Sequence, residues 1–66
     1  MRIFVNSREQ AVPDGASVAA LIELLGMAQK QLAVEVNTDL VPKREWPLFK
    51  LKAEDRVEVV SFVGGG

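Results

Sequence analysis

The stretch RVEVVSF, residues 56–62, decides the fold of this 66-residue chain. Its valines, and the alternation of apolar and charged residues over its first half, are typical of a β-strand. A strand that comes last in the chain has to pair with strands formed earlier, so its place in the sheet fixes the topology. Immediately after it, Val63 leads into three consecutive glycines, residues 64–66.

Two short β-type runs open the chain, at residues 2–6 and 9–12, with Ser7-Arg8 between them. Asn6 tolerates positive φ, so a tight hairpin is expected here. A turn at residues 12–15 leads to Ser17, which is a favourable helix N-cap. The apolar residues behind this cap recur with a helical period, at Val18, Leu21, Ile22 and Leu25. Gly26 is placed to end this helix, which is so short that it needs a sheet to lie on.

A third strand is predicted at residues 32–36, then a turn at 37–39 and a short return strand at 40–41 that Pro42 stops. One helical turn is expected around Trp46, which we interpret as a core side chain. The right-handed crossover rule places the last strand parallel to the first, at the centre of the sheet. The sequence therefore predicts an α+β fold, a β-grasp (ubiquitin-like) mixed sheet with one main helix packed on one face. Its expected domain covers residues 1–63, with a flexible C-terminal glycine tail at 64–66.

Composition narrows the class of protein. The chain has no cysteine, and its net charge is −1 with scattered basic residues, so disulfides and a nucleic-acid partner are not expected. No apolar run is long enough for a signal peptide or a membrane span, so no membrane partner is expected. These features together favour a cytoplasmic, globular protein of one domain.

The inventory of catalytic groups is poor. The chain lacks His, Cys and Tyr, which removes the commonest general base and the strongest nucleophile. Metal-ligand spacing and a phosphate-binding glycine loop are absent as well, so we expect no metal and no bound cofactor. Glu54-Asp55 is interpreted as a solvated acidic turn. An enzyme is therefore not expected, and a carrier or substrate of other enzymes is favoured.

Strand alternation predicts an apolar surface on the face of the sheet that the helix leaves open. If Ile3, Val57 and similar residues face the helix, then Phe4, Val60 and Phe62 face away from it. Glu35 and Glu58 are expected on the same side of the sheet. Phe4, Val60 and Phe62 are the predicted partner interface, because contiguous exposed apolar patches commonly bind partners. The plainer interpretation is that strand ends expose some apolar residues, just as a glycine run can be a frayed end or a linker scar.

The chain resembles the sulfur carrier proteins of thiamine biosynthesis, the ThiS family, over its whole length. The stretches that carry the resemblance are AVEVN (33–37) with VPKREW (41–46), EDRVEVV (54–60) and the terminal VGGG (63–66). It departs from the family at Ser7, Thr38 and Glu54, where the family often has Gly, and at Lys43, where it often has Arg.

This resemblance implies a specific chemistry at the C-terminus. An E1-like adenylating enzyme would use ATP to join AMP to the Gly66 carboxylate. Sulfur from a cysteine desulfurase-derived persulfide donor would then leave a thiocarboxylate, which thiazole synthase would consume. Gly64 and Gly65 would give the tail access to a narrow active site.

Two alternatives stay open at this point. The small subunit of molybdopterin synthase shares the fold and a Gly-Gly end but is usually longer. A β-grasp binding module with an incidental tail would act only through Phe4, Val60 and Phe62. The sequence does not distinguish the exact partners, the oligomeric state, a second sulfur pathway or processing of the C-terminus.

Overall fold

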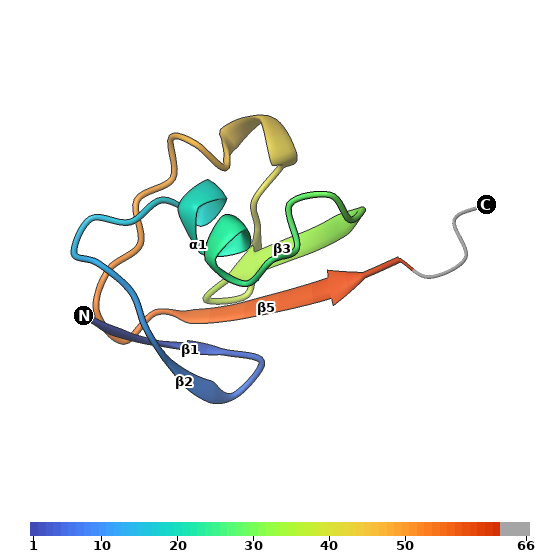
Figure 1. The fold of residues 1–66 in the computed structure, drawn as a ribbon. Coiled ribbons are helices and arrows are strands. Elements are labelled where there is room, and N and C mark those ends of the chain that lie inside the picture. Colours follow the sequence, from blue (N-terminus) through green and yellow to red (C-terminus); the bar gives the residue numbers. More distant parts are fainter. Residues whose placement is uncertain (63–66) are drawn as a thin grey trace.

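The computed structural model describes residues 1–62, so Val63 and the predicted glycine tail lie outside the described residues. A five-stranded mixed sheet has the strand order β2-β1-β5-β3-β4. The strands are β1 (Arg2–Val5), β2 (Arg8–Ala11), β3 (Leu32–Val36), β4 (Asp39–Leu40) and β5 (Arg56–Ser61), with helix α1 (Val18–Leu24) between the two hairpins. Helix α1 lies against one face of this sheet (Figure 1).

The last strand occupies the predicted position. β5 lies between β1 and β3, parallel to β1 and antiparallel to β3. The expected α+β architecture is confirmed: a mixed sheet with one main helix on one face. β5 comes after both hairpins in the chain and joins β1 of the first hairpin to β3 of the second.

Both hairpins turn tightly on an asparagine. Asn6-Ser7 joins β1 to β2 and Asn37-Thr38 joins β3 to β4, and all four residues have positive φ. Positive φ at both central positions is the requirement of a two-residue turn that matches strand twist. Because each turn uses only two residues, β2 begins at Arg8, one residue before the predicted start. β4 is Asp39–Leu40, where 40–41 was expected.

Helix α1 begins and ends at residues that favour helix termini. The Ser17 hydroxyl accepts a hydrogen bond from the Ala20 amide at 3.0 Å, which satisfies one free donor of the first turn. Gly26, just past the C-cap Leu25, has φ +71°, which glycine adopts without steric cost. Val18, Leu21 and Ile22 are buried against the sheet, so the apolar stripe read from the sequence is the face that packs.

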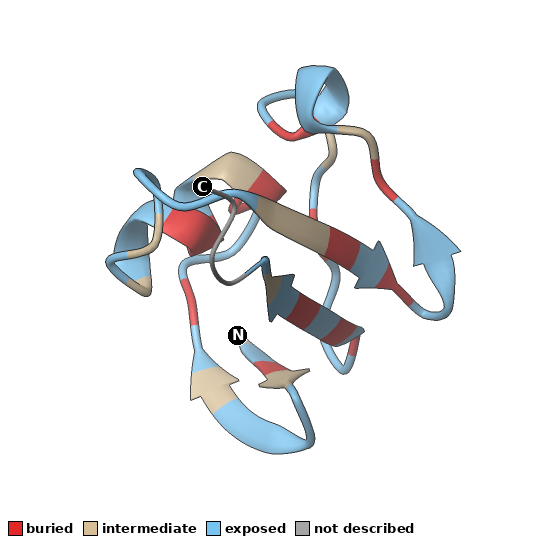
Figure 2. Cartoon of the chain, turned by 90° about the vertical axis from the view of Figure 1, so that its right-hand side faces the viewer, coloured by how far each residue is buried: buried red, intermediate tan, exposed pale blue. Residues whose placement is uncertain are grey.

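The core fills the space between α1, the sheet and the loop after β4. Buried and exposed residues alternate along β5 (Figure 2), and its buried Val57 packs in one cluster with Ile3 and Val34. A short 3₁₀ helix, η1 (Lys43–Glu45), precedes Trp46, which is only 6% exposed. The indole Nε1 donates to the Val41 carbonyl at 2.9 Å, so the predicted core role of Trp46 is confirmed.

Asp55 corrects the interpretation of the acidic turn. This residue is only 9% exposed, and its carboxylate accepts hydrogen bonds from the Lys52 amide at 2.8 Å and from Asn37 Nδ2 at 3.0 Å. The turn is therefore held by a buried carboxylate that joins it to the β3–β4 hairpin. Only Glu54, which is exposed, fits the solvated description.

Candidate functional site

β5 connects the sheet to the predicted reactive end of the chain. It begins near the end of the molecule that carries the N-terminus and runs toward the opposite end (Figure 1). Its residues from Val57 to Ser61 pair with β3 in continuous antiparallel register. Gly64, Gly65 and Gly66 lie outside the described residues, so their roles stay predictions.

The face of the sheet opposite α1 carries alternate residues of three neighbouring strands. Val57 and Val59 are buried toward the helix, so the residues between and beside them face outward. The register puts Phe4 opposite Arg56, Glu35 opposite Glu58, and Ala33 opposite Val60. We call this surface the open face.

Phe4 is part of a cationic corner of the open face. Its ring is half-buried, with the guanidinium carbons of Arg2 and Arg56 at 5.4 and 5.0 Å from the ring centroid. Such distances are typical of cation–π contacts, in which the ring face attracts the cation. A partner that approaches here meets positive charge before it meets the aromatic ring.

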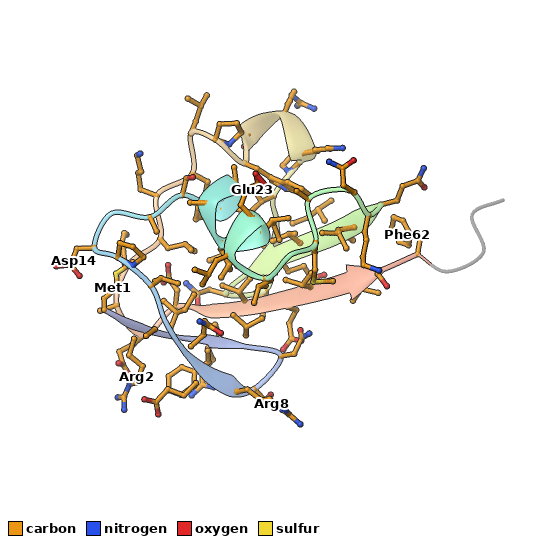
Figure 3. The ribbon with its side chains drawn as sticks, in the orientation of Figure 1. Met1, Arg2, Arg8, Asp14, Glu23 and Phe62 are labelled. Carbon is orange, nitrogen blue, oxygen red and sulfur yellow. The ribbon has the colours of Figure 1, made fainter. Side chains whose placement is uncertain are left out.

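Val60 lies near the other end of β5, and Phe62 directly follows that strand. They are 56% and 57% exposed, and the Phe62 amide donates to the Gln31 carbonyl at 3.0 Å, which holds the chain beside the start of β3. Figure 3 shows Phe62 and Arg2, whose guanidinium lies over Phe4, at opposite ends of the sheet. We call Val60 and Phe62 the distal apolar pair.

The expected continuous apolar patch is therefore divided. Phe4 lies opposite Arg56, and Val60 comes four residues after Arg56 along β5. The exposed Glu58 lies between Arg56 and Val60, and its neighbour on β3 is the exposed Glu35. Like charges directly across two strands destabilise a sheet, and covering them with an apolar partner costs desolvation free energy. Alternation correctly places Phe4 and Val60 on one face, but it does not make them neighbours.

A bidentate ion pair anchors the cationic corner. Arg2 Nη2 and Nε donate to the two carboxylate oxygens of Glu54 at 2.9 and 3.0 Å. The hydrogen bond from Arg2, followed by the weaker effect of its charge, holds the pKa of Glu54 below its ordinary value, and the same bond raises the pKa of Arg2. Glu54 adopts φ +71°, so the pair forms at a backbone position that favours glycine.

The lowered pKa predicts how stability depends on pH. When a carboxyl group has a lower pKa in the folded state than in the unfolded state, its ionised form stabilises the fold. This stabilisation is complete at pH values above the unfolded-state pKa and is lost as the pH falls through the folded-state pKa. Arg2, with its raised pKa, loses its contribution only above its ordinary value, outside the working range. We expect the difference in unfolding free energy between wild type and Glu54→Gln to shrink as the pH falls from about 7 to about 2.

Urea titrations at several pH values measure this difference. Glu23→Gln is the matched control, because the carboxylate of Glu23 makes no ion pair within residues 1–62. If the difference in unfolding free energy between wild type and Glu54→Gln stayed constant over this pH range, the prediction would be contradicted.

Metal ligation and membrane spanning can be checked over the described part of the chain. Within residues 1–62 no group of three or more His, Cys, Asp or Glu side chains is arranged to hold a metal ion. No helix over the same residues is long and apolar enough to cross a membrane.

Comparison with known proteins gives a consistent result across the whole chain. Residues 1–66 match the model of the ThiS family. The sulfur carrier protein ThiS of Escherichia coli is 26% identical over 66 residues, and the match covers 100% of both chains. The crystal structure of the thiamine biosynthesis protein ThiS from Geobacter metallireducens superimposes with a TM-score of 0.84 at 29% identity, again over 100% of both chains.

Two longer relatives carry the name of an enzyme, thiazole synthase. A thiazole synthase of Paramagnetospirillum magneticum is 33% identical over 66 residues, which is 100% of this chain but only 20% of that protein. The chain thus spans one fifth of the length of this relative. A second thiazole synthase, from Magnetococcus marinus, matches with the same identity and the same coverage.

Proposed function

The chain belongs to the ThiS family, and we propose from this premise that it is a sulfur carrier in thiamine (thiazole) biosynthesis that works through the carboxylate of Gly66. The observation that carries the proposal is the match over residues 1–66, because it includes the glycine end as well as the fold. The resemblance to two ThiS proteins over their full lengths supports it.

The proposed chemistry takes place in the active sites of partner enzymes. A carboxylate resists nucleophilic attack until a good leaving group is attached, and an E1-like adenylating enzyme supplies one by transferring AMP from ATP. A persulfide sulfur, delivered from a cysteine desulfurase, then displaces AMP, and cleavage of the sulfur–sulfur bond by a thiol leaves the thiocarboxylate. The carrier contributes no acid, base or cofactor of its own, and this agrees with its lack of His, Cys and Tyr.

Thiazole synthase is the proposed acceptor of the sulfur. Two proteins with that name contain a segment similar to this whole chain, although they are five times longer. A carrier-like segment within the acceptor enzyme supports a direct encounter between the two, because a tethered carrier is presented to the enzyme at a high effective concentration.

Conversion of the chain in a reconstituted mixture tests the proposal. We expect incubation with ATP, the adenylating enzyme and a persulfide donor to raise the intact mass by the difference between one sulfur and one oxygen, with the change at Gly66. An unchanged mass, in conditions that convert a known ThiS protein, would overturn it. Retained binding without conversion would favour the alternative of a β-grasp binding module.

The distal apolar pair gives the second prediction for this function. We expect Val60→Asp and Phe62→Asp each to raise the KM of the adenylating enzyme for the carrier by about tenfold or more, because exposed apolar side chains near the centre of an interface dominate binding. Both side chains are more than half exposed, so the fold stays intact. Steady-state kinetics with the variant carriers measure the effect.

Leu48→Asp is the matched control, because Leu48 is 78% exposed but follows η1 in the loop outside the sheet. Phe4→Asp is a poorer probe, since it also removes the ring beneath two guanidinium groups. Wild-type KM values for both distal variants would show that this pair is not the interface.

A further inference from the structure

β5 extends beyond the strand that flanks it on one side. β1 ends at Val5, which lies opposite Val57, whereas β5 continues to Ser61. On the other side, β3 accompanies it as far as Ser61. Within residues 1–62, the second half of β5 therefore has no neighbouring strand on the β1 side to form its backbone hydrogen bonds.

The side chain of Asn6 supplies these hydrogen bonds. Its Oδ1 accepts from the Val59 amide at 2.8 Å, and its Nδ2 donates to the Val59 carbonyl at 3.1 Å. The Asn6 backbone amide also donates to the Val57 carbonyl at 2.8 Å. A carboxamide carries the same donor and acceptor as a peptide group, so the side chain imitates one more residue of β1.

The turn geometry makes this contact available. Asn6 has φ +50°, a left-handed conformation that Asn tolerates better than most residues. The backbone thus turns away into the β1–β2 hairpin while the side chain remains against β5. We call the two contacts from this side chain to Val59 the Asn6 clamp.

Asn37 makes a comparable contact at the other end of β5 and on its other side. Its Oδ1 accepts from the Arg56 amide at 2.9 Å, its Nδ2 donates to the Asp55 carboxylate at 3.0 Å, and its own φ is also +50°. The two asparagines thus share turn type, backbone conformation and number of side-chain hydrogen bonds. They differ in distance from the tail, because Asn37 holds the start of β5 and Asn6 holds its later half.

We propose that Asn6 is a positioning residue for sulfur loading: its clamp on Val59 sets the direction in which the chain leaves the sheet toward Gly66. This inference rests on the proposed carrier function. Past Val59, β5 pairs with β3 alone in the described part of the chain. Among residues 1–62, the clamp is therefore the contact from the β1 side that lies nearest to the proposed reactive end.

Asn6→Gly and Asn37→Gly form the matched test, because glycine accepts the positive φ of each turn while both variants lose the same side chain, the carboxamide with its methylene. We expect Asn6→Gly to speed hydrogen exchange at the Val59 amide and to lower the ¹⁵N order parameters of Ser61 and Phe62. We expect it also to lower kcat for thiocarboxylate formation by about tenfold, with KM unchanged, since misplaced reacting groups slow the chemical step. Asn37→Gly should leave the hydrogen exchange at Val59, the order parameters of Ser61 and Phe62, and kcat at their wild-type values.

Asn6→Asp gives an intermediate variant that also keeps the turn. It still accepts from the Val59 amide but has no donor for the Val59 carbonyl, so we expect values between wild type and Asn6→Gly. Wild-type order parameters at Ser61 and Phe62 in Asn6→Gly would overturn the inference even if no variant were converted. Equal losses of kcat in Asn6→Gly and Asn37→Gly would also overturn it, since they indicate only a structural role. Failure of the wild-type chain to be converted, in contrast, would count against the proposed function.

Discussion

Removal of Gly66 is expected to reduce thiocarboxylate formation at least a hundredfold while leaving the fold unchanged. The variant still ends in two glycines, so its terminal chemistry is the same, but its carboxylate is one residue closer to the sheet. One residue of extended chain spans about 3.5 Å. Displacements of about 1 Å from the reactive geometry already cost large factors in rate. Intact mass after incubation with the adenylating enzyme, ATP and a persulfide donor measures the loss.

A chain lengthened by one terminal glycine is the matched control for this deletion. It moves the carboxylate outward by the same distance and again keeps glycine at the end. If the position of the terminal carboxylate decides conversion, both variants are converted far less than wild type. Both should still unfold at the same urea concentration as wild type, because the core and all hydrogen bonds described above lie within residues 1–62. Conversion of the shortened chain at the wild-type rate would contradict the assignment of Gly66 as the modified residue.

Local signals were sufficient to predict most of the fold. The Ser17 cap, the helical stripe and Gly26 each act within a few residues, and the structure places all three as expected. The position of β5 followed from a general rule of chain connection, which needs only the order of the elements. Strand ends were less well predicted, because a tight turn on Asn6 or Asn37 moves a boundary by one residue without changing the pattern.

The candidate site was predicted only in part, because its geometry depends on register between distant strands. Nothing local to Phe4 indicates that Arg56 lies opposite it, about fifty residues later in the sequence, and covers its ring. Asp55 is similar: its sequence context is polar, and its burial follows from the approach of Asn37. The clamp on Val59 was missed because the turn alone already explains an asparagine at position 6.

The second large effect is expected in the core rather than at the tail: Trp46→Ala should leave the chain largely unfolded. Truncating a buried Trp costs about 3–5 kcal/mol, and a domain of this size has a net stability of about the same magnitude. Trp46 is 6% exposed, and its carbonyl accepts from the Ala19 amide at 3.0 Å, so the residue joins the loop to α1 as well as filling the core. Far-ultraviolet circular dichroism during urea titration measures the loss.

Trp46→Phe separates the two contributions of this side chain, because it keeps most of the apolar volume and removes the indole donor. The Val41 carbonyl then loses its partner at 2.9 Å, at a cost of about 1–3 kcal/mol, so this variant should fold with reduced stability. Equal stability of Trp46→Ala and wild type would contradict the core assignment. The variants of Trp46 and Gly66 also distinguish the role of the fold from the role of the terminus. Trp46→Ala should lose carrier activity because the open face and β5 are no longer formed. Removal of Gly66 should leave a folded chain that still binds its partner but is hardly converted.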